Sequence, residues 1–137
     1  MTRVTLDSNI YISALVFGGK PMRLLEMATE GAIRVGISDA IIAEVQRVLL
    51  TKFGWSLERV AAAVETIGTI TEQATPTEAV EIVKTDPDDN RVVECAMTAG
   101  SAFIVSGDVD LLALGEFRGI TIVTAAAFLA RFDEQDL

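Results

Sequence analysis

Short, mostly apolar runs alternate with longer amphipathic segments along nearly the whole sequence. The runs at 4–6, 33–37, 102–105 and 120–123 are rich in Val and Ile, and none is longer than five residues. Strands of this composition are typical of parallel sheets whose two faces are both covered by helices. The pattern predicts a three-layer α/β/α domain around a central, mainly parallel sheet of four to five strands.

Helix signals separate these runs. Ser38 and Ser56 are expected to cap helices over 39–52 and 57–70, and Pro87 is placed to open a helix over 87–99. Further helices are expected over 9–16, from Pro21 to about Thr29, over 109–114 and, after a Thr124 cap, over 125–132. The run "AVEIV" at 79–83 is expected to form a third strand. A chain of 137 residues suits one domain, so residues 1–137 are expected to fold as a single unit.

Composition restricts the chemistry. The chain has no histidine, which excludes Ser-His-Asp triads, histidine general bases and nearly all catalytic zinc sites. It carries 20 Asp and Glu against 11 Lys and Arg, a formal net charge of -9. This balance argues against a broad basic surface for nucleic acid. It does not argue against a nuclease whose carboxylates hold metal ions, because bound cations reverse the local field.

Two further features concern location. Cys95 is the single cysteine, so an intramolecular disulfide is impossible and a reducing cytoplasm suits the chain. No apolar run approaches the roughly 20 residues of a membrane helix, so no membrane association is expected. We therefore expect a cytoplasmic protein.

Acidic residues follow the predicted strands. Because the carboxyl ends of parallel strands meet at one edge of a sheet, residues just after them are expected to lie together. The acids placed in this way, from four separate parts of the sequence, are Asp7, Asp39, Glu44, Asp86, Asp88, Asp89, Asp108 and Asp110. The sequence thus predicts a cluster of carboxylates at this edge.

Each acid also has a purely structural interpretation. Asp7 and Asp108 are each placed to cap the helix that follows, and for both residues the two interpretations stay open. For Asp86, which precedes Pro87, a helix cap is the preferred interpretation. Glu44 lies too deep in its helix for a capping box, but it can form a surface pair with Arg47 three residues later.

Taken together, the acids favour a metal site. Several carboxylates without a cationic partner repel one another and raise each other's pKa. Hard divalent cations such as Mg²⁺ remove this conflict, because they take oxygen ligands. Two such ions about 4 Å apart can activate water and stabilise the leaving oxygen of a phosphodiester. Asp7, at the mouth of its strand, is then explained as a metal ligand held on a rigid element.

The order of these motifs resembles the PIN-domain family, and most closely the PIN toxins of bacterial and archaeal toxin–antitoxin modules. The resemblance spans nearly the whole chain. It rests on "VTLDSNIYISAL" at the start, Glu44 within "SDAIIAEVQRVL", "DPDDNRVVECAMTAG" at 86–100, "AFIVSGDVDLLAL" at 102–114 and the final "ITIVTAAAFL".

The resemblance implies a Mg²⁺- or Mn²⁺-dependent ribonuclease. The four family acids, which are catalytic and metal-binding, fall on Asp7, Glu44, Asp89 and Asp108. Asn9 beside the first acid, Ser106 before the fourth and Asp110 after it are expected to be auxiliary.

The resemblance also implies partners: an RNA substrate, a second copy of the chain in a homodimer, and a cognate antitoxin protein. Phe53, Trp55 and Leu57 are candidates for such contacts, or else join the two helices at 39–52 and 57–70.

Other classes fit less well. A response-regulator receiver domain needs a lysine beyond its last strand, whereas the last lysine here is Lys84. A haloacid-dehalogenase phosphatase needs a second Asp two residues after its nucleophile, where this chain has Asn9. The remaining alternative is a non-catalytic, acidic α/β binding module, receiver-like or partner-binding, whose acids serve a basic partner.

Overall fold

The computed structural model describes residues 1–136 and confirms an α/β fold with a mostly parallel sheet. The strand order is β3-β2-β1-β4-β6-β5. Four parallel strands form the body of the sheet: β2 (Arg34–Ile37), β1 (Arg3–Leu6), β4 (Phe103–Val105) and β6 (Ile120–Val123). The two-residue strands β3 (Glu72–Gln73), parallel, and β5 (Glu116–Phe117), antiparallel, extend it at its edges. These two strands bring the total to six, against the four to five expected.

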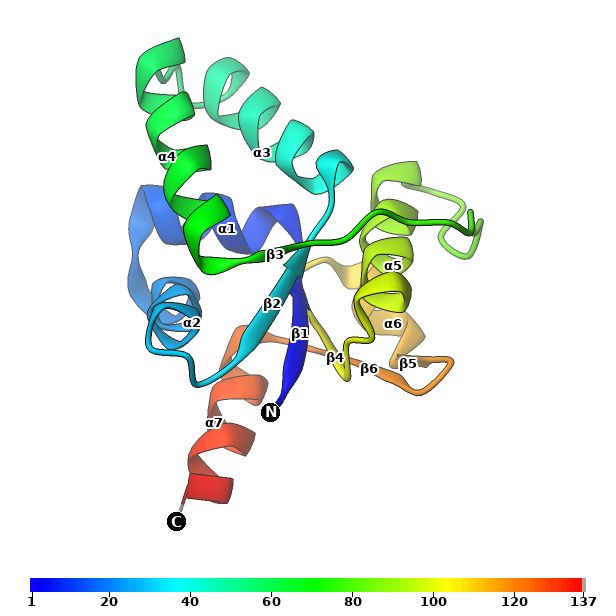
Figure 1. Cartoon of the computed structure of the whole chain (residues 1–137). Helices are drawn as coiled ribbons and strands as arrows, with labels where there is room; N and C mark the ends of the chain where they lie inside the picture. Colours follow the sequence, from blue (N-terminus) through cyan, green and yellow to red (C-terminus); the bar gives the residue numbers. More distant parts are fainter. Residues whose placement is uncertain (137) are drawn as a thin grey trace.

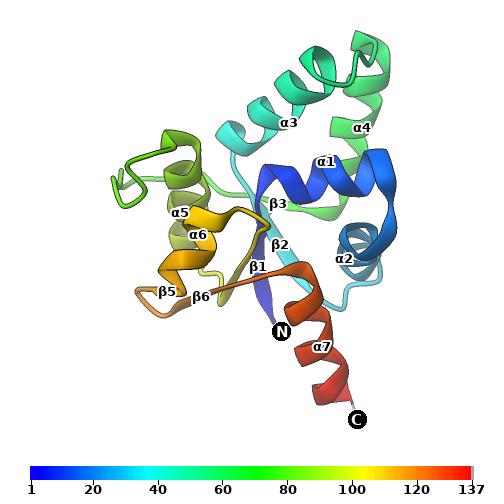
Figure 2. The same ribbon diagram turned by 180° about the vertical axis from the view of Figure 1, so that it is seen from behind.

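Helices cover both faces of the sheet (Figures 1 and 2). One face carries α5 (Pro87–Ala99) and α6 (Val109–Leu114), and the other carries α1 (Ser8–Phe17) and α2 (Gly19–Thr29). The pair α3 (Asp39–Thr51) and α4 (Leu57–Ile70) packs beyond α1, and α7 (Ala125–Asp136) projects past the opposite end of the strands. No helix in residues 1–136 is long and apolar enough to cross a membrane.

The predicted caps are confirmed. The hydroxyl oxygens of Ser38, Ser56 and Thr124 accept hydrogen bonds from the backbone N–H groups of the helices that follow, at 3.4, 3.1 and 3.1 Å. Pro87 stands in the first turn of α5. Helix α7 continues to Asp136, four residues past the expected end.

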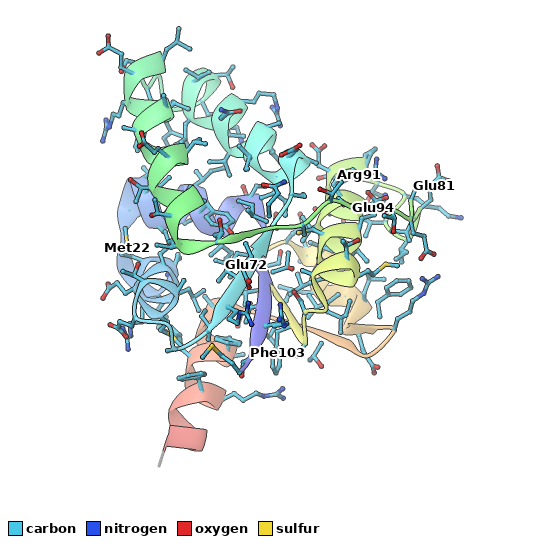
Figure 3. The ribbon with its side chains drawn as sticks, in the orientation of Figure 1. Met22, Glu72, Glu81, Arg91, Glu94 and Phe103 are labelled. Carbon is cyan, nitrogen blue, oxygen red and sulfur yellow. The ribbon has the colours of Figure 1, made fainter. Side chains whose placement is uncertain are left out.

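The expected strand at 79–83 is wrong. The backbone of this segment is bound by three side chains of α5 and does not pair with a neighbouring strand. The Glu94 carboxylate accepts from Val80 N–H at 2.8 Å, and the Asn90 side-chain oxygen accepts from Ile82 and Val83 N–H at 2.9 and 2.8 Å. Arg91 pairs with Glu94 at 2.8 Å, and Figure 3 shows both side chains at the upper part of α5. We call Asn90, Arg91 and Glu94 together the clasp. The N–H groups of Val80, Ile82 and Val83 therefore already have acceptors.

Close packing between the sheet and α5 gives a stability prediction. A Cβ atom added at Gly36 in β2 would lie 2.6 Å from the Ala99 Cβ atom. Gly36→Ala is therefore expected to lower the free energy of unfolding by about 1–3 kcal/mol. The matched control is Gly68→Ala in α4, where no described atom lies within 4 Å of the added Cβ atom. That change should stabilise the helix by about 0.5–1 kcal/mol. Urea unfolding of both variants measures the difference, and equal effects would contradict the packing argument.

Candidate metal centre

The predicted acids lie where β1 and β4 end and where α1, α5 and α6 begin (Figure 1). Asp7 directly follows β1, and its backbone N–H donates to the Val105 carbonyl at 3.0 Å, which extends the pairing with β4. Asp89 lies in the first turn of α5, and Asp108 directly precedes α6. Three elements distant in sequence thus bring carboxylates to one edge of the sheet.

Asp7 does not cap the helix that follows it. Its backbone stands at the N-cap position of α1, but its carboxylate forms no cap hydrogen bond with the described first turn. The side chain is 3% exposed, and its oxygens accept from the Ser106 hydroxyl at 2.7 Å and from the Ser8 hydroxyl at 3.2 Å. Burial raises the pKa of Asp7 more than the hydroxyls of Ser106 and Ser8 lower it. The two hydroxyls therefore hold the Asp7 carboxylate toward the candidate site, and it does not turn back to the first-turn N–H groups of α1.

Among the acids of this edge, Asp89 has the environment least favourable to a charged carboxylate. One oxygen each of Asp86, Asp89 and Asp108 lies within 4.8 Å of the others. Asp89 is 4% exposed, and its buried Oδ2 has no hydrogen-bond partner among the residues that the structure describes. Burial, followed by the charges of Asp108 and Asp86, raises the pKa of Asp89 to about 8. Asp89 thus has a buried oxygen without a donor and a carboxylate close to two others, an arrangement that a cation would relieve.

Asp86 and Asp108 both cap helices and also join this cluster. Asp86 Oδ1 accepts from Asp88 N–H at 3.0 Å. Asp108 Oδ1 accepts from the N–H groups of Asp110 and Leu111 at 2.9 and 3.2 Å. In each residue the cap bonds use Oδ1, and a carboxylate has two oxygens, so a cap does not prevent the residue from also binding a cation. The capping interpretation and the site interpretation are compatible for these two residues.

Glu44 approaches the cluster from α3. Its side chain is 21% exposed, and Oε1 lies 3.8 Å from Arg47 Nη2, so the expected pair with Arg47 forms. Burial raises the pKa of Glu44; the Ser8 hydroxyl opposes this, while the charges of Asp88 and Asp7 add to it. Glu44 therefore interacts with Asp7 and lies outside the trio of Asp86, Asp89 and Asp108.

The three expected auxiliary residues take different positions. Ser106 is fully buried and links two acids, since its hydroxyl donates to Asp7 and accepts from Asp108 N–H at 2.9 Å. Asp110 is exposed and accepts from the Thr85 hydroxyl at 2.9 Å, which ties the loop before α5 to α6. Asn9 is exposed in the first turn of α1.

The residues present fit a hard divalent cation. All ligand candidates at this edge offer carboxylate oxygen, the donor type that Mg²⁺ and Mn²⁺ prefer. The sequence predicts a helix cap for Asp86, not a metal ligand, because a "DP" pair is typical of a helix start. The signal for its second role is the density of acids in "DPDD", which a cap alone does not require.

The raised pKa values predict how stability depends on pH without metal. Folded Asp89 keeps its proton up to about pH 8, whereas an unfolded Asp ionises near 3.8, so between these values the folded state binds more protons. The free energy of unfolding should therefore fall as pH rises, by up to about 1.4 kcal/mol per pH unit. Urea unfolding in EDTA at about pH 6, 7 and 8 measures the slope. Stability that is flat or rises over this range would contradict the raised pKa of Asp89.

Comparisons with known proteins agree with this architecture. A family model described as PIN domain matches residues 3–110. The structure of VapBC2 from Rickettsia felis bound to a DNA fragment from their promoter superposes with a TM-score of 0.60 at 13% identity, covering 88% of this chain and 97% of that one. The structure of VapBC-1 from nontypeable Haemophilus influenzae superposes with a TM-score of 0.62 at 14% identity, covering 91% of this chain and 99% of that one. No curated protein sequence matches significantly. The expected family is confirmed: the chain belongs to the PIN-domain family.

Proposed function

We propose that this chain is a Mg²⁺- or Mn²⁺-dependent endoribonuclease that hydrolyses RNA phosphodiester bonds, working as one domain over residues 1–137. The observation that carries the proposal is buried Asp89, whose Oδ2 lacks a described partner and whose carboxylate lies close to those of Asp86 and Asp108 at the edge of a PIN-domain sheet. A protein core tolerates such an oxygen where a ligand completes it.

Asp7, Glu44, Asp89 and Asp108, with Asp86 added, would hold the cation. Bound by these residues, a divalent ion would supply Lewis-acid chemistry for phosphodiester hydrolysis. Ser106 fixes the orientation of the Asp7 carboxylate through its 2.7 Å hydrogen bond. Asp86 and Asp108 are fixed by their caps, so the ligands stand on rigid helix starts. In the overall reaction the oxygen of a water molecule bonds to phosphorus, the P–O3′ bond breaks, O3′ takes up a proton from water to become a hydroxyl, and the downstream fragment keeps the 5′-phosphate.

We further propose that the chain is the toxin of a cytoplasmic toxin–antitoxin pair and forms a homodimer. Two of its structural neighbours are VapBC structures, which supports a protein partner by analogy. An exposed apolar surface is also available: Phe17, Phe53 and Leu57 are 77%, 39% and 76% exposed, and the rings of Phe17 and Phe53 meet edge to face at 6.2 Å. Packing between α3 and α4 therefore leaves part of Phe53 and most of Leu57 accessible to a partner.

The test is RNA cleavage by purified protein in Mg²⁺, in Mn²⁺ and in excess EDTA, with analysis of the product ends. We expect cleavage with either ion, none in EDTA, and products that carry 5′-phosphate and 3′-hydroxyl groups. Cleavage that persists in EDTA, or products ending in 2′,3′-cyclic phosphate, would contradict the mechanism. Metal binding with no cleavage of any RNA would favour the alternative of an acidic binding module.

A further inference from the structure

Arg47 is the cation placed at the candidate site. Within residues 1–136, the ion pairs that reach carboxylates of this edge come from its guanidinium: Nη2 lies 3.8 Å from Glu44 Oε1 and 3.9 Å from Asp88 Oδ2. Arg47 therefore spans the gap between α3 and the start of α5. In a chain of net charge -9, a positive group between two acidic elements at the site is the exception.

The contacts of Arg47 are loose. Both distances exceed those of a hydrogen bond, and the side chain is 59% exposed. Arg91, by contrast, is engaged at 2.8 Å by the buried Glu94, and Arg34 makes a two-pronged pair with Glu72. Exposed ion pairs of the Arg47 kind contribute little to stability, so exchanging one acceptor for another costs little. The five N–H donors of Arg47 remain available to a new acceptor.

The position of Arg47 on α3 indicates which new acceptor its N–H groups would bind. Glu44 and Arg47 are three residues apart, so they lie on neighbouring turns of one helix face. The Glu44 side chain is 21% exposed and that of Arg47 59%, so Glu44 lies nearer the inner part of the site and Arg47 at its rim. A planar guanidinium matches two oxygens of one phosphate group. A single RNA strand bound at the site would place further phosphates close to the one that reacts.

We infer that Arg47 contacts a phosphate of the RNA strand next to the cleaved bond, exchanging Glu44 and Asp88 for it. This inference rests on the proposed function. The protein then offsets its own negative field at one point of the site while the rest of its surface stays acidic. Arg47 acts on substrate binding and takes no part in bond breaking.

The test compares Arg47→Gln with Arg23→Gln. Arg23 is matched: it is 49% exposed and pairs with two carboxylates, Glu30 at 3.1 Å and Glu26 at 3.9 Å, but it lies on α2. Both variants remove one positive charge. We expect Arg47→Gln to raise KM about tenfold with kcat nearly unchanged, as for one charge-assisted hydrogen bond. The slope of log(kcat/KM) against log[KCl] should shrink by about 0.7, one phosphate contact on a single strand, while Arg23→Gln leaves both unchanged. Arg47→Lys should restore most of the slope.

A second measurement separates this inference from the proposed function. Binding of a fluorescent single-stranded RNA is followed by anisotropy against salt for the same proteins. If the wild type binds RNA without cleaving it, the hydrolytic function fails, and the slope of Arg47→Gln still decides the contact. Equal slopes for wild type and Arg47→Gln, or the same change in Arg23→Gln, would overturn the role of Arg47. No RNA binding by the wild type would overturn both.

Discussion

Asp89→Asn should abolish RNA cleavage and at the same time make the metal-free protein more stable. The substitution keeps the shape of the side chain and removes a buried carboxyl group that must either take up a proton or carry a charge beside Asp86 and Asp108. The new amide can also donate a hydrogen bond to these neighbouring carboxylates. We expect the free energy of unfolding in EDTA to rise by about 1–2 kcal/mol, as for relief of a functional site under stress. Cleavage should fall at least a hundredfold, because the ligand set is incomplete.

Two comparisons make this result specific. Glu65→Gln removes an exposed charge on α4 and should change neither activity nor stability measurably. Asp7→Asn should also abolish cleavage, and it should not weaken α1, because the Asp7 side chain makes no cap bond there. Asp89→Asn protein that cleaves RNA at the wild-type rate would refute the assignment, as would a metal-free variant less stable than wild type.

Asn90→Ala should cause the largest loss of stability outside the apolar core. The buried Asn90 amide makes three hydrogen bonds with the segment before α5, two accepted from Ile82 and Val83 N–H and one donated to the Val83 carbonyl at 2.8 Å. Truncation leaves these backbone groups without their partner, so we expect a loss of about 2–4 kcal/mol. Urea unfolding gives the total, and hydrogen exchange at the Ile82 and Val83 amides shows where protection is lost.

The effect of Asn90→Ala should extend to metal affinity, because the segment that Asn90 holds runs directly into Asp86. The control is Thr85→Ala, which removes an exposed bond to Asp110 and should cost less than about 0.5 kcal/mol. A loss below 1 kcal/mol for Asn90→Ala, with unchanged amide protection, would mean that the clasp does not hold this segment.

The parts of the fold that the sequence predicts are those with local signals. Ser38, Ser56 and Thr124 precede helices within three residues of the groups they cap, so their roles can be read from short stretches. The strand at 79–83 fails for the opposite reason: its apolar residues suit a strand, but its backbone partners are Asn90 and Glu94, seven to fourteen residues away. The signal for these partners is the spacing of Asn90 and Glu94, two polar residues four apart that flank the apolar Val92 and Val93 in "NRVVECA". The two-residue strands β3 and β5 carry too few residues for any pattern.

The candidate site divides in the same way. That Asp7, Asp89 and Asp108 approach one edge follows from the topology of a parallel sheet, which the strand pattern predicts. The hydrogen bond from Ser106 to Asp7 joins residues 99 apart, and the proximity of Asp86 to Asp108 depends on how α5 and α6 pack. Such contacts leave no trace in local sequence. Local sequence therefore predicts only the cap role of Asp86, although this residue also belongs to the cluster.

The central claim is that these carboxylates form a metal site, and a Mn²⁺ titration of thermal stability tests it most directly. An ion that binds the folded state alone raises stability by RT ln(1 + [L]/Kd), so Tm should climb steadily with ion concentration. We predict this rise for wild type and Glu65→Gln, and a much smaller one for Asp89→Asn, so that wild type, the less stable protein in EDTA, becomes the more stable one in Mn²⁺. A Tm that does not respond to Mn²⁺, or that responds equally in Asp89→Asn, would contradict the metal site.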